Sequence, residues 1–295
     1  MTVLVVGEAL VDVVQNADGD DAQTHPGGSP FNVAIGLARL GVDTELATQI
    51  GDDANGSLLT TGLEHAGVRR SPDVHPVDVT SSASARVLAD GSAEYEFDLS
   101  WDPGALPDLA GFEAVHVGSL GAFLEPGASQ VADLALMADA FGIPVSFDPN
   151  VRPAVSDDAD AWRATFARFA PHARIIKLSD DDAAILYPDV AASDLARRLA
   201  SEGALVAVTQ GVGGSLIAHR DRLVVLEAPS VEVVDTIGAG DSYMAAMLAW
   251  CAMYNWPDAD ELELSELHDL GEYAAHAASI TVSRPGADPP HLDEL

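Results

Sequence analysis

The 295-residue sequence predicts an α/β protein: a three-layer α/β/α sandwich with a mostly parallel sheet, plus a small β-sheet lid. Short apolar runs alternate with helical patterns along the chain. Strands separated by helices pair in parallel through crossover connections. Hydrophobic residues make up 48% of the chain, enough for a large core at this length. We therefore expect a single domain over residues 1–295.

The expected elements follow one another in order. Val3–Val6 is an apolar run typical of a buried strand. Ser29–Leu40 predicts a helix, because Ser29 suits the N-cap, Pro30 the first turn and Gly41 the end. Further strands are expected at 44–50, 114–117, 144–147, 174–178 and 205–208. Further helices are expected at 55–65, 129–141, 182–186, 193–201, 239–254 and 264–279.

Two stretches interrupt this alternation. Residues 10–15 continue past the first strand, and residues 74–99 alternate apolar with polar around a turn at Asp90-Gly91. We expect a small antiparallel sheet, built from about 10–26 and 74–102, that projects from the main domain as a lid.

The charge excludes several functions. The chain has 47 acidic and 14 basic residues, a formal net charge of −33, and Lys177 is its only lysine. A chain this acidic is not expected to bind nucleic acid or an anionic membrane through broad electrostatics. Since Lys177 is followed by Leu178, there is no P-loop of the Gly-x-x-x-x-Gly-Lys-Ser/Thr type.

The single cysteine, Cys251, excludes an intrachain disulfide and a cysteine metal cluster. The first seven residues contain no basic region, and the chain has no apolar run of 18 residues. These observations predict a cytoplasmic protein with neither a signal peptide nor a membrane span.

The most informative segment is Asp235-Thr-Ile-Gly-Ala-Gly-Asp241, which leads into a strongly apolar helix. Small residues at a helix start leave backbone N–H groups free at the positive end of the helix dipole, which makes an anion site without lysine. A carboxylate beside that site, here Asp241, suits deprotonation of a hydroxyl that attacks a phosphate. The alternative is a plain N-cap, for which one small residue would suffice.

A second segment, Gly27-Gly28-Ser29-Pro30-Phe31-Asn32-Val33-Ala34, lies near the N-terminus. Paired glycines let the backbone approach a ligand closely, and Asn32 offers a donor and an acceptor. Asp12, flanked by valines just past the first strand, is a candidate ligand for sugar hydroxyls. The alternatives are a tight turn at the glycines and an exposed strand position at Asp12.

Together, the two segments resemble the two signatures of the ribokinase-like, or PfkB, carbohydrate kinases, Gly-Gly-x-x-x-Asn-x-Ala and Asp-Thr-x-Gly-Ala-Gly-Asp. The resemblance covers essentially the whole chain, including the projecting sheet. It implies that Asp241 is the catalytic base and that Gly238, Ala239 and Gly240 form the anion hole. It also implies a sugar site, which we expect to contain Asp12, Gly28, Asn32, Arg86 and Arg152.

The resemblance also implies Mg²⁺, ATP as co-substrate and possible use of K⁺. The stretch Thr209-Gln-Gly-Val-Gly-Gly-Ser215 resembles the family's nucleotide-lining loop. The expected nucleotide-binding residues are Lys177, Ser179, Thr209, Gly211, Gly214 and His276. Asp182 is expected to hold magnesium through water, and Asp235 a monovalent cation.

Some positions depart from the family. Where the family often has Asn-x-x-Glu near magnesium, this chain has Ser179-Asp-Asp-Asp182, which keeps oxygen ligands but shortens their reach. The same residues also suit an N-cap with acids in the first helical turn, and both roles can hold together. His276 stands where the family often has Asn; the alternative is an ordinary helix histidine.

The stretch Asp148-Pro-Asn-Val-Arg152 resembles the fructokinase and 2-keto-3-deoxygluconate kinase branches. The predicted lid carries Glu96 and Asp98, which would repel an acidic sugar. We therefore expect a neutral sugar, fructose first, to give fructose 6-phosphate. Alternatives are 2-keto-3-deoxygluconate kinase, ribokinase, nucleoside kinase, or a sugar-binding regulator without catalysis.

Other sequence features bear on dimer formation, on competing functions and on adaptation to salt. The lid's apolar face, with Val87, Tyr95 and Phe97 as candidates, suits a homodimer through the lid sheets. His219-Arg220-Asp221 resembles a protein-kinase catalytic loop but lacks its downstream Asn, and no dinucleotide-binding glycine motif is present. The excess of Asp over Glu and the near absence of lysine suggest adaptation to high salt, although a GC-rich genome would also favour arginine.

Overall fold

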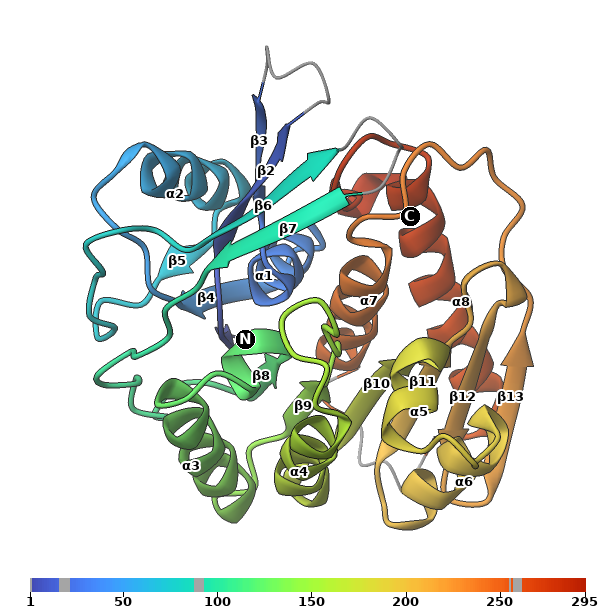
Figure 1. Ribbon diagram of the computed structural model, residues 1–295. Helices are drawn as coiled ribbons and strands as arrows, with labels where there is room; N and C mark the ends of the chain where they lie inside the picture. Colours follow the sequence, from blue (N-terminus) through green and yellow to red (C-terminus); the bar gives the residue numbers. More distant parts are fainter. Residues whose placement is uncertain (1, 16–21, 88–92, 255, 257–261) are drawn as a thin grey trace.

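The computed structural model describes residues 2–15, 22–87, 93–254, 256 and 262–295 (Figure 1). A nine-stranded sheet has the order β13-β12-β11-β10-β9-β8-β1-β4-β5. Neighbours are parallel from β11 to β5, whereas β12 runs antiparallel to both β11 and β13. Its strands are β1 Thr2–Val6, β4 Asp43–Ala47, β5 Arg69–Arg70, β8 Ala114–Gly118, β9 Val145–Asp148, β10 Ile175–Ser179, β11 Leu205–Thr209, β12 Ser215–His219 and β13 Arg222–Leu226. The mostly parallel α/β fold is therefore confirmed.

Helices cover both faces of this sheet. They are α1 Ser29–Arg39, α2 Ala54–Ala66, α3 Gly127–Ala140, α4 Ala159–Phe169, α5 Asp180–Leu186, α6 Ala192–Ser201, α7 Ala239–Met253 and α8 Leu264–Val282. Successive side chains of β1 enter opposite layers: Val3 and Val5 pack in the core shared with α1, α2, α7 and α8, and Leu4 and Val6 in the core shared with α3 to α6. This alternation follows from the two-residue period of a strand buried on both faces.

A second, four-stranded sheet has the order β3-β2-β6-β7 and lies next to α2 (Figure 1). Its strands are β2 Leu10–Gln15, β3 Ala22–Gly27, β6 Ser82–Val87 and β7 Ala93–Asp98. The expectation of a purely antiparallel sheet is wrong: β2 pairs antiparallel with β3 but in parallel with β6, which is reached through a long connection rather than a hairpin. Its action as a lid and its use in a dimer stay predictions; the turn at Asp90-Gly91 and the side chains of Val87 and Tyr95 lie outside the described residues.

Several boundaries and elements differ from expectation. The predicted N-cap at Ser29 is wrong: Gly28 occupies the N-cap position, and Ser29 is the first helical residue. Helix α4 and the hairpin β12–β13 were not predicted. The αL residue Gly67 ends α2. No helix in the described part of the chain is long and apolar enough to cross a membrane.

Candidate active site

The glycine-rich segment forms the start of α7. Gly238 is the N-cap residue with a φ of 75°, a left-handed conformation that favours glycine, and Ala239 and Gly240 open the helix. N–H groups in the first turn of a helix have no partner within the helix and can bind an anion. Here Ala239 N donates to Thr236 O at 3.3 Å, a contact that a bound anion would have to replace. Asp241 lies in this turn with its side chain buried.

The carboxylate of Asp241 joins the two sequence segments. Ser29 Oγ donates to Asp241 Oδ1 at 2.6 Å, and Asn32 Nδ2 donates to Asp241 Oδ2 at 2.8 Å. All three side chains are buried, and more than 200 positions separate the partners in sequence. Each carboxylate oxygen keeps a further lone pair for a substrate proton, since an ionised carboxylate accepts about four hydrogen bonds. The structure thus fixes the orientation of this carboxylate from α1.

The only lysine lies beneath the same helix start. Lys177, on β10, donates to Asp148 Oδ2 at 2.9 Å, and both side chains are almost completely buried. A Cβ placed on Gly240 would lie 2.9 Å from Lys177 Nζ, so the ammonium reaches the backbone of the anion site. Burial raises the pKa of Asp148 to about 6, against the opposing effect of Lys177. Lys177 therefore lies beside the backbone of Gly240, and its role as a nucleotide ligand stays a prediction.

Asp12 and the paired glycines meet where β2 and β3 pair. A side chain on Gly27 would collide with the carboxylate of Asp12, and one on Gly28 would lie 2.7 Å from the carbonyl oxygen of Glu8. Gly28 also has a φ of 102°, which side chains rarely adopt. Burial raises the pKa of Asp12, while Arg152 and His25 act to lower it. The glycines thus leave room for the Asp12 carboxylate.

Glu8 is a site residue that the sequence analysis missed. Its side chain is buried after β1, and its Oε2 accepts a hydrogen bond from Gly121 N at 2.7 Å. Burial raises its pKa to about 7, opposed by hydrogen bonds from Ser119 and the backbone and by the charge of Arg152. An acid directly after an apolar strand, at the sheet edge where ligands bind, was the available signal. Arg152 therefore acts on two carboxylates, Glu8 and Asp12.

Ser179 and Asp182 form a capping box at the start of α5. Ser179 Oγ accepts from Asp182 N at 3.0 Å, and Asp182 Oδ2 accepts from Ser179 N at 2.8 Å. Asp182 Oδ1 accepts from Val151 N at 2.8 Å. The structural role proposed for these residues is present, and the predicted contact of Asp182 with magnesium through water stays a prediction that uses its remaining lone pairs.

The predicted nucleotide residues lie on β10, on β11, in the turn before β12 and on α8. Thr209, at the end of β11, is the register partner of Ser179 on β10. Gly211 and Gly214 have φ values of 53° and 92° in the turn before β12. His276 is exposed on α8, and its role in nucleotide binding stays a prediction beside the alternative of an ordinary helix histidine. Arg86 lies on β6, opposite Glu94 of β7, but its side chain is outside the described part of the structure.

Asp235, the predicted cation ligand, already accepts two backbone hydrogen bonds. Its Oδ1 accepts from Ile237 N at 3.0 Å and its Oδ2 from Gly286 N at 2.9 Å. Partial burial acts to raise its pKa, but hydrogen bonds from the backbone of Ile237, Gly286 and Thr236 lower it. The carboxylate therefore remains ionised, as a cation ligand must be.

Comparison with known proteins agrees with this geometry. The family model "pfkB family carbohydrate kinase" matches residues 2–294. The chain belongs to the PfkB family of carbohydrate kinases. This kinase is 34% identical over 268 residues to a fructokinase of Klebsiella pneumoniae. The aligned region covers 86% of this chain and 85% of that relative.

Two solved structures are similar along nearly the whole chain. The fructokinase of Xylella fastidiosa with bound ATP has a TM-score of 0.82 and 25% identity, covering 99% of this kinase and 96% of that chain. The aminoimidazole riboside kinase of Salmonella enterica, complexed with aminoimidazole riboside and an ATP analog, has a TM-score of 0.83 and 27% identity. The match covers 97% of this kinase and 95% of that chain. The protein is thus a phosphotransferase with a ribokinase-like fold.

Proposed function

We propose that this kinase transfers the γ-phosphoryl group of ATP to a hydroxyl of a neutral monosaccharide, with fructose as first candidate and Asp241 as base. The observation that carries the proposal is the pair of hydrogen bonds from Ser29 and Asn32 to Asp241. They hold a buried carboxylate beside the N–H groups that open α7. A base beside an anion site is what transfer of a phosphoryl group to a hydroxyl requires.

In the proposed mechanism, Asp12 and Asn32 orient the sugar, and Asp241 takes the proton of the attacking hydroxyl. The backbone N–H groups of Gly238 to Gly240 and the ammonium of Lys177 stabilise the charge on the phosphoryl oxygens. Phosphoryl transfer depends on positioning and charge stabilisation, so fixed dipoles and one buried cation suit it.

The donor chemistry near Lys177 fits a magnesium ion. Asp148, Asp182 and Asp241 are all close enough to Lys177 to raise its pKa, although burial alone would lower it. Magnesium prefers such oxygen ligands and usually keeps several waters. Asp182 would hold the ion through water, and when bound it would supply charge neutralisation to the ATP phosphates. Asp235 would hold a monovalent cation.

Charge supports a neutral substrate. Arg152 acts on both Glu8 and Asp12, so two carboxylates share this cation. Glu96 and Asp98 are exposed on β7 of the small sheet. An acidic sugar such as 2-keto-3-deoxygluconate would bring a further negative charge to these groups. The second candidate substrate is a riboside, favoured by the similarity to the aminoimidazole riboside kinase.

The test is a panel of sugars and ribosides with Mg-ATP, reading ADP release with and without potassium. We expect fructose to have the highest kcat/KM. Turnover of 2-keto-3-deoxygluconate at least tenfold better than fructose would refute the neutral-sugar proposal, and a riboside as best substrate would establish the second candidate.

The base is tested separately. Asp241→Asn should lower kcat by about 10²–10⁴-fold while sugar binding is retained, because the base is lost. The amide NH2 also cannot accept one of the two hydrogen bonds from Ser29 and Asn32. Asp160→Asn, which removes an exposed carboxylate from α4, is the matched control and should leave kcat unchanged. Unchanged turnover in Asp241→Asn would show that another group is the base.

A further inference from the structure

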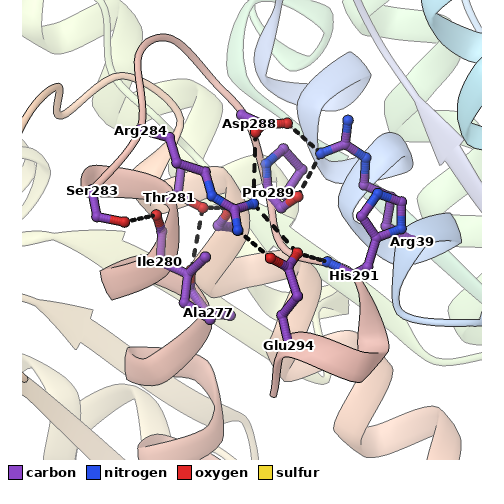
Figure 2. Close-up of polar contacts among 11 residues, drawn as sticks. Arg39, Ala277, Ile280, Thr281, Ser283, Arg284, Asp288, Pro289, His291 and Glu294 are labelled. Carbon is purple, nitrogen blue, oxygen red and sulfur yellow. Dashed lines mark hydrogen bonds and ion pairs between the residues drawn. The ribbon is translucent and has the colours of Figure 1, made fainter.

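The C-terminal segment, residues 283–295, runs from the end of α8 to α1 and carries a chain of ion pairs (Figure 2). Asp288 lies between two arginines. Its Oδ1 is 2.5 Å from Arg39 Nη1 of α1, and its Oδ2 is 3.6 Å from Arg284 Nη1. Arg284 also pairs with Glu294, whose Oε2 accepts from His291 N at 2.8 Å. One carboxylate thus connects α1 with the end of α8.

The same segment packs on the glycine-rich segment before α7. Gly286 N donates to Asp235 Oδ2 at 2.9 Å. A Cβ on Gly238 would lie 2.6 Å from the Cβ of Ala287, so the two backbones are in close contact. Asp288 N donates back to Gly286 O at 3.0 Å, which closes a turn between the ion pairs and Asp235. Movement of this turn would therefore move the anion-site backbone.

The C-terminal segment also contacts helix α1. Arg39, in its last turn, donates to the carbonyl oxygen of Pro289 at 2.5 Å as well as to Asp288. The first turns of the same helix carry Ser29 and Asn32, which bind Asp241. Asp288 therefore lies where the helix that orients the proposed base meets the turn that supports the proposed anion site.

We propose that Asp288 is a positioning residue: bound by Arg39 and Arg284, it holds the turn at 286–288 against Asp235 and Gly238 and so fixes the backbone that receives the phosphoryl group. This inference rests on the proposed roles of Gly238 to Gly240. Without the carboxylate, Arg284 keeps its pair with Glu294, but Arg39 keeps only the carbonyl oxygen of Pro289, so the turn at 286–288 loses its ion pair with α1. A displacement of about 1 Å at a reacting centre costs up to about 100-fold in rate.

The experiment measures kcat, sugar KM and melting temperature for Asp288→Ala and Asp288→Glu. Asp288→Ala should lower kcat at least about tenfold, or about 1.4 kcal/mol of activation free energy, with sugar KM within about threefold. Asp288→Glu keeps the charge and should restore most of kcat. The control is Asp160→Ala, which breaks an exposed pair with Arg163 at 2.6 Å and should change neither constant.

Arg284→Met gives an independent variant if Asp288→Ala fails to fold, and it should lower kcat in the same direction. A variant with a lower melting temperature but unchanged kcat would overturn the proposal, since Asp288 would then serve stability alone. Failure of Asp288→Ala or Arg284→Met to affect kcat, while Asp241→Asn is inactive, refutes this inference without affecting the proposed function. Full activity of Asp241→Asn refutes the proposed base instead.

Discussion

Replacing Glu8 with Gln should make the stability of the protein less sensitive to pH. Burial raises the pKa of Glu8 from 4.5 to about 7. Between these pH values the folded state binds more protons than the unfolded state, so the contribution of Glu8 to stability falls as pH rises. The difference between 4.5 and about 7 corresponds to about 3 kcal/mol. Gln is neutral at every pH and its side-chain oxygen can still accept from Gly121 N.

The difference in unfolding free energy between Glu8→Gln and the wild type should therefore grow with pH. We expect it to be near zero at pH 4.5 and to favour the variant by about 3 kcal/mol at pH 8. Urea unfolding at several pH values measures this difference, and groups common to both proteins cancel. The exposed Glu64→Gln variant controls for removal of one negative charge. A difference that is constant with pH, or that turns against the variant as pH rises, would refute the reasoning.

Two further predictions concern charge. Lys177→Met should lower the free energy of unfolding, measured in urea, by about 3–5 kcal/mol, because it leaves Asp148 buried without its partner. Adding Asp148→Leu should recover most of that loss. A Lys177→Met variant as stable as the wild type would contradict this prediction. The net charge of −33 predicts that the melting temperature rises from low to molar KCl, since salt screens self-repulsion. An unchanged melting temperature would count against salt adaptation.

Most helices and parallel strands could be predicted because their apolar runs are long and continuous. Helix α4 was not predicted, because its start carries the acidic residues Asp158 and Asp160 and no apolar run. Asp158 is in fact its N-cap, accepting from Asp160 N and Ala161 N at 3.0 Å. The buried residues Trp162, Phe166 and Phe169 recur at helical spacing, so the signal was present.

The hairpin β12–β13 was missed for a different reason. Its turn is formed by Arg220 and Asp221, between β12 and β13. Arg220 has a φ of 53° there, a conformation that sequence patterns do not reveal for arginine. The short apolar runs on either side of this turn are the sequence evidence for two antiparallel strands.

The residue types of the candidate site could be predicted from its two segments, but their contacts could not. Asn32 and Asp241 were each proposed alone, and nothing in the spacing shows that Ser29 and Asn32 would bind the carboxylate of Asp241. Ser29 was expected to cap its own helix, whereas a glycine does so and the serine hydroxyl is used across the core. Long-range contacts of this kind depend on how α1 and α7 pack.

The placement of the few cations bears on how so acidic a protein binds ATP. Lys177 lies beside the proposed anion site, and Arg152 lies near Asp12 of the proposed sugar site. Arg39 and Arg284 bind Asp288 in the turn beside Asp235. Electrostatic attraction near a site depends on the local charges and fixed dipoles more than on net charge. The backbone N–H groups at the start of α7 add positive potential without any charged side chain. The negative charge on the rest of the molecule therefore need not oppose phosphate binding, provided that salt screens it beyond about 10 Å.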